Sequence, residues 1–320
     1  MTKNSSSLSL AALVVLLSNC NRADFDPVSK VESVRILAIR ADEPYATPGD
    51  TVNLDVLAFD GRATQPEPMQ IFWLPTPCID PTGDAYYACY PGFAQSFQPG
   101  VDLTPLLLSG QTFSFPMPTD VIGLHQGSHG AAPYGLAVAF AIACAGHVEF
   151  LAPTSDGSPE ALPFGCFDIN HNRLGPSDFV ISYAQIYSFP DRSNENPVIE
   201  NLLFAGAVVD AATGIVVDHC AKSDIDQCAT NSLGVTLSGS SQEADPSAVG
   251  LKEQLYVDYF LTSGKVKHDA MILADAKTGS LPNSDDAFYS PLSAGDSQIW
   301  AVVHDNRGGV AWVQVAVHAQ

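Results

Sequence analysis

The sequence is poor in basic residues. Its 320 residues include 14 Lys and Arg against 35 Asp and Glu, which gives a formal net charge of −21 at pH 7. Proteins that bind DNA, RNA or anionic lipid neutralise phosphates with clustered Lys and Arg side chains. The charge balance therefore argues against phosphate-rich partners, and no nucleic acid is expected as a ligand.

Several motifs that carry chemistry are also absent. The sequence has no Cys-x-x-Cys, no His-Glu-x-x-His, no Gly-x-Ser-x-Gly and neither of the glycine-rich phosphate-binding motifs. These absences remove the usual sequence support for thioredoxin-like redox proteins, zinc proteases, α/β-hydrolases and nucleotide-binding enzymes. No stretch keeps the helical period over three turns, so large helical domains are not expected either.

The chain begins with a short apolar run. Residues 8–17 follow Lys3 and a polar stretch, and the run has about half of the ~20 residues that a bilayer-spanning helix needs. Such a run is typical of the hydrophobic part of a secretory signal peptide. We therefore expect residues 1–19 to be a signal peptide.

The end of this leader, with the sequence LLSNC at residues 16–20, resembles a bacterial lipobox. The resemblance implies that Cys20 is diacylated, becomes the new N-terminus and reaches the membrane through its lipid, with residues 20–33 as a tether. Asn21 at the next position favours outer-membrane sorting. The expected location is the outer membrane, on the cell surface or the periplasmic face. The alternative is an ordinary cleaved signal peptide in which Cys20 is incidental.

The cysteine count is odd. If Cys20 carries lipid, six cysteines are left, and they fall into three couples that are close in sequence. This grouping favours local disulfides in an exported protein, although sequence alone leaves other pairings open. The alternative is a set of buried free thiols. The expected pairs are Cys78–Cys89, Cys144–Cys166 and Cys220–Cys228.

A period of two in the apolar pattern predicts strands along most of the chain. Residues 51–56 alternate cleanly, and residues 136–145 form an apolar run typical of a strand buried on both faces. Residues 299–304 and 310–318 predict a hairpin. Many short strands between Gly and Pro turns predict an all-β fold made of β-sandwiches. The polar segment 191–197 predicts the boundary between domains at 34–190, with long loops, and 191–320.

Two regions resemble bacterial immunoglobulin-like domains. Residues 34–44 and the turn and strand at 48–52 resemble the opening of such a domain, and residues 196–199 resemble the start of a second. Residues 303–312 resemble its closing hairpin. With the leader, this layout is similar to that of exported lipoproteins of myxobacteria and related deltaproteobacteria. The resemblance implies two tandem immunoglobulin-like β-sandwiches and an exported location, and it implies no catalytic residues.

One segment is similar to a calcium-binding loop. Asp168, Asn170 and Asn172 offer oxygen ligands at its first, third and fifth positions, and Asp178 follows at the eleventh. Ca²⁺ takes six to eight oxygen ligands, which such a spacing can wrap around one ion. An Asx-rich turn between strands explains the same residues without an ion, and we favour that interpretation. No cofactor is therefore expected, with a calcium ion at this loop as the alternative.

Histidines and tryptophans have structural interpretations. His125 and His129 lie four residues apart, with His147 and His171 later, but the neighbouring glycines favour loop histidines over a shared zinc ion. The tryptophans lie in strand patterns and are expected in the core or on a sheet face rather than as a sugar-stacking platform. They are Trp73, Trp300 and Trp312.

The expected function is a binding or structural role in the cell envelope, with an envelope protein or a glycan as partner. Loops on a rigid scaffold carry the function of such folds. The long segment 78–109 is the expected ligand-contacting loop because Tyr86, Tyr87 and Tyr90 cluster beside a predicted disulfide. One alternative is a secreted or surface hydrolase that acts on extracellular polymers. A second is an accessory subunit of an envelope complex.

Overall fold

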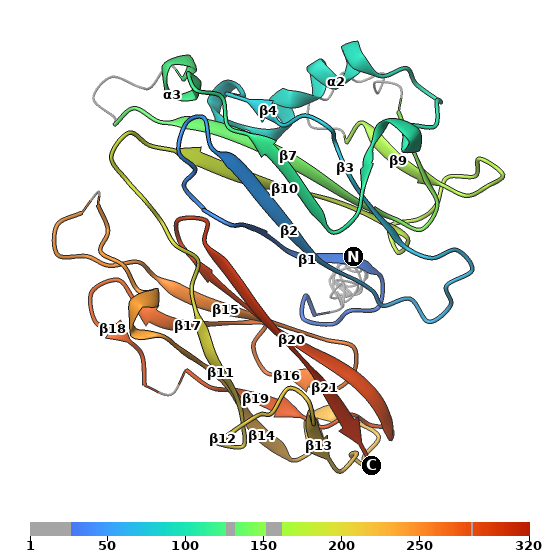
Figure 1. Cartoon of the computed structure of the whole chain (residues 1–320). Coiled ribbons are helices and arrows are strands. Elements are labelled where there is room, and N and C mark those ends of the chain that lie inside the picture. The colour runs from blue at the N-terminus through green and yellow to red at the C-terminus, as the bar shows by residue number, and fades with distance from the viewer. Residues whose placement is uncertain (1–26, 126–131, 152–161, 247, 283) are drawn as a thin grey trace, which may run out of the picture.

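A computed structural model describes residues 27–125, 132–151, 162–246, 248–282 and 284–320 (Figure 1). Strands dominate it, and its two α-helices are short: α2 (Tyr90–Ser96) and α3 (Val121–Leu124). The predicted all-β class is confirmed. The expected signal peptide at 1–19 and the lipidation site Cys20 lie outside the described residues. Within the described ranges, no helix has the length and apolarity that crossing a membrane requires.

The N-terminal half is a sandwich of two sheets. One sheet has the order β1-β2-β6, and the other has the order β10-β7-β3-β5 with β4 also paired to β7. The chain places β1 and β2 in the first sheet, crosses to the second for β3 to β5, returns for β6 and ends in the second with β7 and β10, as in immunoglobulin-type sandwiches. The strands are β1 (Val34–Ala41), β2 (Thr51–Asp60), β3 (Gln70–Trp73), β4 (Cys78–Ile79), β5 (Leu108–Ser109), β6 (Thr112–Pro116), β7 (Gly135–Cys144) and β10 (Phe179–Ser188).

Strand β7 is buried along its whole length, as its apolar run predicts. Its alanines at 137, 139, 141 and 143 face the core of the sandwich, where the ring of Trp73 packs. Its larger side chains, such as Leu136 and Phe140, face the opposite way, into a second core beneath α2 and its neighbouring turns. A short two-stranded ribbon, β8 (His147–Phe150) and β9 (Phe164–Phe167), completes this covering layer.

The C-terminal half repeats the same arrangement. Its sheets have the orders β12-β11-β14-β19-β16 and β13-β21-β20-β15-β17-β18, with β13 parallel to β21. The strands are β11 (Ile199–Phe204), β12 (Ala207–Val208), β13 (Ile215–Val217), β14 (Thr230–Leu237), β15 (Leu255–Leu261), β16 (Lys265–Val266), β17 (Ala270–Asp275), β18 (Gly279–Ser280), β19 (Asp286–Tyr289), β20 (Gly295–Asp305) and β21 (Val310–Ala319). The predicted closing hairpin is β20–β21, in which His304 pairs with Val310.

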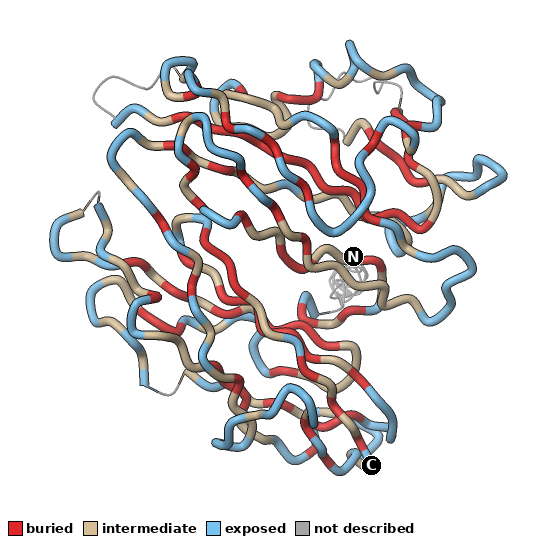
Figure 2. Tube along the Cα trace, viewed as in Figure 1, coloured by how far each residue is buried: buried red, intermediate tan, exposed pale blue. Residues whose placement is uncertain are grey.

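The two sandwiches are packed against each other. The outer face of β1 and β2 meets the outer face of β15, β20 and β21 through a buried apolar cluster that includes Leu37, Phe260 and Trp300. The ring centroids of Trp300 and Phe59 lie 4.7 Å apart across this contact. Figure 1 shows β1 and β2 above β20, and Figure 2 shows buried backbone in both sandwiches. Because the contact is apolar and closed, the halves form a single stack of sheets.

The tryptophans lie in apolar clusters or against one, as the strand patterns predict. Trp73 and Trp300 are buried, one within the N-terminal sandwich and one between the two halves. Trp312 is half-buried at the edge of the same contact, and the guanidinium of Arg40 lies 4.4 Å from its ring centroid.

The expected tether needs a correction over its described part, residues 27–33. Val31 is buried, and its backbone N–H donates to the carbonyl of Leu261 in β15. The N–H of Leu261 in turn donates to the carbonyl of Ser29. This segment therefore adds to the C-terminal sandwich instead of standing free. The polar composition concealed this because the contact depends on backbone hydrogen bonds and on one buried apolar side chain, that of Val31.

The three predicted cysteine couples are joined as disulfides. Cys78 bonds to Cys89, Cys144 to Cys166 and Cys220 to Cys228, each closing a short loop. The second bridge ties the end of β7 to β9. Structural disulfides persist in oxidising environments, so the chain has the chemistry of a protein from such a compartment.

Candidate binding cleft

A cleft of about 750 Å³ opens between the two sandwiches. The edge strands β1 and β10 and the turn after β1 form one wall, and the ends of β15, β20 and β21 form the other. Leu37, Ala38 and Val310 belong both to the apolar contact and to the cleft lining, so the cleft opens at the edge of that contact. The lining side chains that carry rings or polar groups are Tyr45, Ser182, Tyr183, Gln185, Tyr187, Phe189, Tyr256, His304, Asn306 and Arg307.

Aromatic rings form much of the lining of the cleft. The ring of Tyr45 lies 4.7 Å from that of Phe189, and Phe189 is stacked on Tyr187 at 6.2 Å between centroids. On the opposite wall, Tyr256 is stacked on His304 at 5.0 Å. These rings are only partly buried, so their faces are available to a ligand. Partly exposed aromatic faces with a few polar groups are typical of small-molecule and glycan sites.

The cleft differs from the rest of the surface in charge. The chain carries 35 Asp and Glu, yet no Asp or Glu is found among the described residues that line this cleft. Its single guanidinium, that of Arg307, is neutralised from behind: Nη2 lies 2.5 Å from Oε2 of Glu243, and Nε donates to Glu253. The described lining therefore holds no carboxylate, and its guanidinium is paired with two carboxylates that lie outside the lining.

Arg307 is held in place by the turn between β20 and β21. Its backbone N–H donates to Oδ1 of Asp305 at 2.7 Å, and the N–H of Gly309 donates to the same oxygen at 2.8 Å. Nδ2 of Asn194, in the segment between the halves, donates to Oδ2 of Asp305 at 3.0 Å. The guanidinium then lies 5.7 Å from the ring centroid of Tyr45. This network connects the turn that carries Arg307 to the segment between the two halves.

The phenol groups of the cleft stay protonated over the physiological pH range. Burial raises the pKa of Tyr45, Tyr183, Tyr187 and Tyr256, and an unperturbed phenol already titrates near pH 10. Each hydroxyl is therefore a neutral group that can both donate and accept a hydrogen bond.

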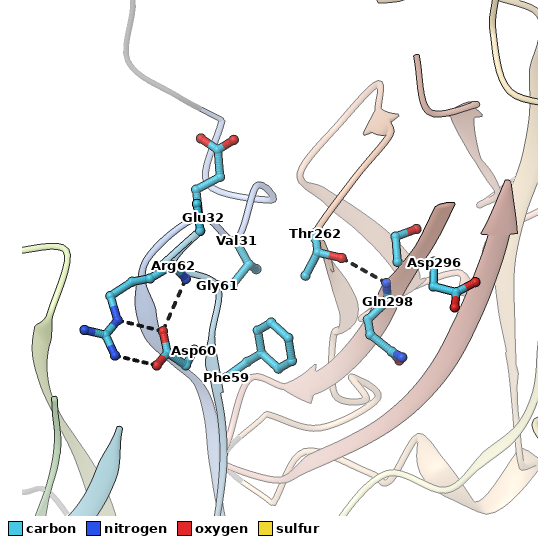
Figure 3. Close-up of a pocket in the computed structure, with 11 residues that line it drawn as sticks. Val31, Glu32, Phe59, Asp60, Gly61, Arg62, Thr262, Asp296 and Gln298 are labelled. Carbon is cyan, nitrogen blue, oxygen red and sulfur yellow. Dashed lines mark hydrogen bonds and ion pairs between the residues drawn. The ribbon is translucent and has the colours of Figure 1, made fainter. Parts of the chain in front are cut away.

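A second cavity of about 460 Å³ lies between the halves near the start of β20 (Figure 3). It is less suited to a ligand because its polar groups are already engaged. Arg62 donates to both carboxylate oxygens of Asp60, at 2.8 and 2.7 Å, and to Asp178 at 2.8 Å. Thr262 accepts a hydrogen bond from the backbone of Gln298. We therefore take the aromatic cleft as the candidate site.

The predicted ligand-contacting tyrosines lie elsewhere, which corrects part of the expectation. Tyr90 is only 8% exposed and packs against Phe93 and Phe140 in the core beneath α2; burial raises its pKa to about 12. Tyr86 and Tyr87 are partly buried against the same core. The tyrosines cluster because their rings cover an apolar face. Only Tyr86 approaches the cleft, stacked at 4.4 Å on Tyr183.

The residues of the predicted calcium loop make an Asx turn. The carboxylate of Asp168 accepts the backbone N–H groups of Asn170 and Asn172, each at 2.8 Å, and the side-chain amide of Asn172 at 2.9 Å. These bonds hold the pKa of Asp168 below its usual range. The carboxylate of Asp178 instead faces Arg62. The described contacts favour the turn over a calcium loop.

The histidines divide into three cases. His125 hydrogen-bonds Asp80 at 2.6 Å, and His129 lies outside the described residues. His147 and His171, which no sequence motif connects, both contact Glu149. Burial alone would raise the pKa of Glu149, but the hydrogen bonds from His171 and His147 outweigh it and lower that pKa.

Comparisons with known proteins give little further information. No family model and no curated protein matches the chain. Among solved structures, the fibronectin(III)-like modules of Clostridium thermocellum CbhA align over 88% of this chain and 94% of theirs, with 10% identity and a TM-score of 0.23. Three N-terminal domains of the bacteriophage RB49 Highly Immunogenic Outer Capsid protein align over 90% and 59%, with 9% identity and a TM-score of 0.20.

Dimeric latent PorU from Porphyromonas gingivalis aligns over 91% of this chain and 24% of its own, with 10% identity and a TM-score of 0.23. TM-scores this low carry no argument about function. The immunoglobulin-like character of the chain rests on its own strand order, which both sandwiches repeat.

Proposed function

We propose that this chain is an exported glycan-binding protein that holds an uncharged saccharide in the aromatic cleft. The observation that carries the proposal is the composition of the cleft, which is lined by aromatic rings and neutral polar groups and by no carboxylate. Sugar rings present apolar C–H faces that pack on aromatic rings, and their hydroxyls pair with neutral donors and acceptors.

The charge of the molecule favours a neutral saccharide over an acidic one. With a net charge of −21, the surface repels polyanions, and Arg307 is already neutralised by Glu243 and Glu253. An uncharged glycan avoids this repulsion and needs no buried counter-ion.

The same composition favours binding over hydrolysis in this cleft. Glycosidases generally cleave between a pair of Asp or Glu side chains that flank the bond. None of the described lining residues is Asp or Glu. Among the described residues, moreover, no serine hydroxyl is hydrogen-bonded to a histidine, as a serine-hydrolase site requires.

The test is affinity electrophoresis through gels that contain laminarin, barley β-glucan, starch or galactomannan, with the acidic polymer alginate as the charged comparison. We expect at least one neutral polymer to retard the protein and alginate not to retard it. Tyr256→Ala should weaken that retardation roughly tenfold, or about 1.4 kcal/mol, because it removes the ring stacked on His304.

Tyr289→Ala is the matched control, since Tyr289 is a partly buried ring on β19, away from the cleft. The proposal fails if no neutral polymer retards the protein, or if both variants lose retardation equally. Shortening of the polymer during the assay would support the hydrolase alternative instead.

We further propose that the mature protein is anchored to the outer membrane by a lipid on Cys20. The apolar run of the leader at residues 1–19 and its ending in LLSNC support this proposal. Two acyl chains give durable membrane attachment.

Intact mass of the membrane-extracted protein tests this anchor. The expected mass begins at Cys20, includes two or three acyl chains, and rises by six hydrogens on reduction of the three disulfides. Cys20→Ala should abolish the acyl mass and leave the gain on reduction unchanged. An unlipidated wild-type mass would contradict the anchor and leave the cleft proposal intact.

A further inference from the structure

Three residues with metal-binding side chains meet at one end of the N-terminal sandwich, away from the cleft. His147 and Glu149 are two apart on β8, so their side chains share a face of the ribbon. His171 comes from the turn that follows β9. Nε2 of His147 lies 2.9 Å and Nδ1 of His171 lies 2.8 Å from the same oxygen, Oε1 of Glu149.

The local backbone holds these residues together. Gly146 precedes β8, and a Cβ there would lie 2.1 Å from the carbonyl oxygen of Phe167, so only glycine permits this approach of β8 to β9. The disulfide Cys144–Cys166 fastens the end of β7, two residues before Gly146, to β9. The Asx turn of Asp168 then presents His171, whose φ of 60° lies in the left-handed region.

The burial of the three side chains is graded. Glu149 is 5% exposed, the side chain of His147 is 18% exposed, and that of His171 is 68% exposed. The carboxylate is thus removed from water while one imidazole stands at the surface. A buried carboxylate is stable only when it is paired or coordinates a metal, and the open side leaves room for an ion to enter and keep water ligands.

We propose that His147, Glu149 and His171 bind one divalent transition-metal ion of the Zn²⁺ class. The nitrogen and oxygen atoms named above all lie within 4.8 Å of one another, so small side-chain rotations bring them around a single ion. Two imidazoles and one carboxylate, with water in the open position, form a donor set that Zn²⁺ accepts. Ca²⁺ prefers oxygen ligands only, so the nitrogens favour a transition metal over calcium.

Such an ion would fasten the turn at 168–172 to β8. A ligand that binds the folded chain and not the unfolded one stabilises the fold by mass action. The site is independent of the glycan cleft, because none of the three ligands lines that cleft.

The experiment uses the full exported chain with its disulfides formed, stripped of metal by a chelator and titrated with Zn²⁺ against a chromogenic competitor. We expect one equivalent to bind with a micromolar or tighter dissociation constant. Co²⁺ should give the intense visible d–d absorption of a four-coordinate site, whereas six-coordinate ions held loosely at surface carboxylates absorb only weakly.

His171→Asn is the decisive variant, because the side chain is exposed and asparagine tolerates a left-handed backbone. It should weaken Zn²⁺ binding at least about tenfold and abolish the Co²⁺ absorption, with the far-ultraviolet circular dichroism unchanged. His147→Gln, which removes the ligand on β8, should weaken Zn²⁺ binding and abolish the Co²⁺ absorption in the same way.

His318→Gln is the matched control, since Nδ1 of His318 also lies 2.8 Å from a carboxylate, that of Asp296, on an exposed surface. It should leave binding unchanged. Absence of tight binding by the wild type overturns the proposal. So does a loss of equal size in His318→Gln, or binding that His171→Asn leaves intact.

Discussion

Replacement of Trp300 with alanine is expected to lower the free energy of unfolding by about 3–5 kcal/mol. The side chain is 1% exposed and lies in the apolar cluster that joins the two sandwiches, against the ring of Phe59. Truncation removes a large ring from a closed contact and leaves a cavity that two rigid sheets cannot easily collapse. Urea-induced unfolding, followed by circular dichroism, measures the effect.

Trp312→Ala provides the comparison, because that ring is half-buried at the rim of the same cluster, beneath the guanidinium of Arg40. Its expected cost is smaller, about 1–2 kcal/mol, because less apolar area is lost from contact. Trp300→Phe keeps most of the volume and should also cost less than alanine. A larger loss in Trp312→Ala than in Trp300→Ala would contradict a closed contact between the halves.

The fold was predictable where the pattern is local. Strand β7 was expected because an apolar run of strand length leaves only a position buried on both faces, and the β20–β21 hairpin because two alternating segments flank a turn. The disulfides follow from spacing in the same way. In each case the residues that carry the signal are neighbours in the sequence.

Strands that depend on tertiary partners were missed. Strand β19 is four residues long and begins with a charged residue, Asp286, so it is too short to show an alternating apolar pattern. In the fold Asp286 is buried, because it accepts hydrogen bonds from the backbone N–H of His268 at 2.8 Å and from the imidazole Nδ1 at 2.9 Å. A buried charge becomes acceptable only through such a partner, and the sequence does not reveal it.

The candidate sites were missed for the same reason. Tyr45, Phe189 and Tyr256 are far apart in the sequence and become neighbours only when the sandwiches pack. For the metal site a partial signal existed, since His147 and Glu149 share one face of a strand. The residue spacing after β9 indicates oxygen ligands, whereas the turn in that segment presents the imidazole of His171.

A second large loss of folding stability is expected when Arg307 is replaced. Its side chain is 9% exposed and lies between Glu243 and Glu253, and the latter side chain is 1% exposed. Arg307→Met keeps the length but removes the charge, which leaves a buried carboxylate without its partner; such a break costs about 3–5 kcal/mol. Arg40→Met is the matched control, because its bond to Asp55 is exposed and should be worth about 0–1 kcal/mol.

The loss in Arg307→Met should depend on pH in a defined direction. Burial raises the pKa of Glu253, the charge of Asp305 raises it further, and Arg307 opposes both. The folded state therefore holds this proton more tightly than the unfolded state, and stability falls as pH rises from the unfolded pKa, about 4.3, through the folded one. Removing Arg307 raises the pKa of Glu253 in the folded state further. The loss of stability in Arg307→Met should therefore be small near pH 4, where Glu253 is protonated, and full at neutral pH.

Arg307→Met/Glu253→Gln separates this cause from simple loss of packing. With the carboxylate neutral, no unpaired buried charge is left, so the double variant should be more stable at pH 7 than Arg307→Met alone and should lose the added pH dependence. Urea unfolding of the single and double variants near pH 4 and at pH 7 measures these differences in stability. If the double variant is as unstable as the single one at both pH values, the guanidinium acts through its packing on Tyr45 and not through its charge.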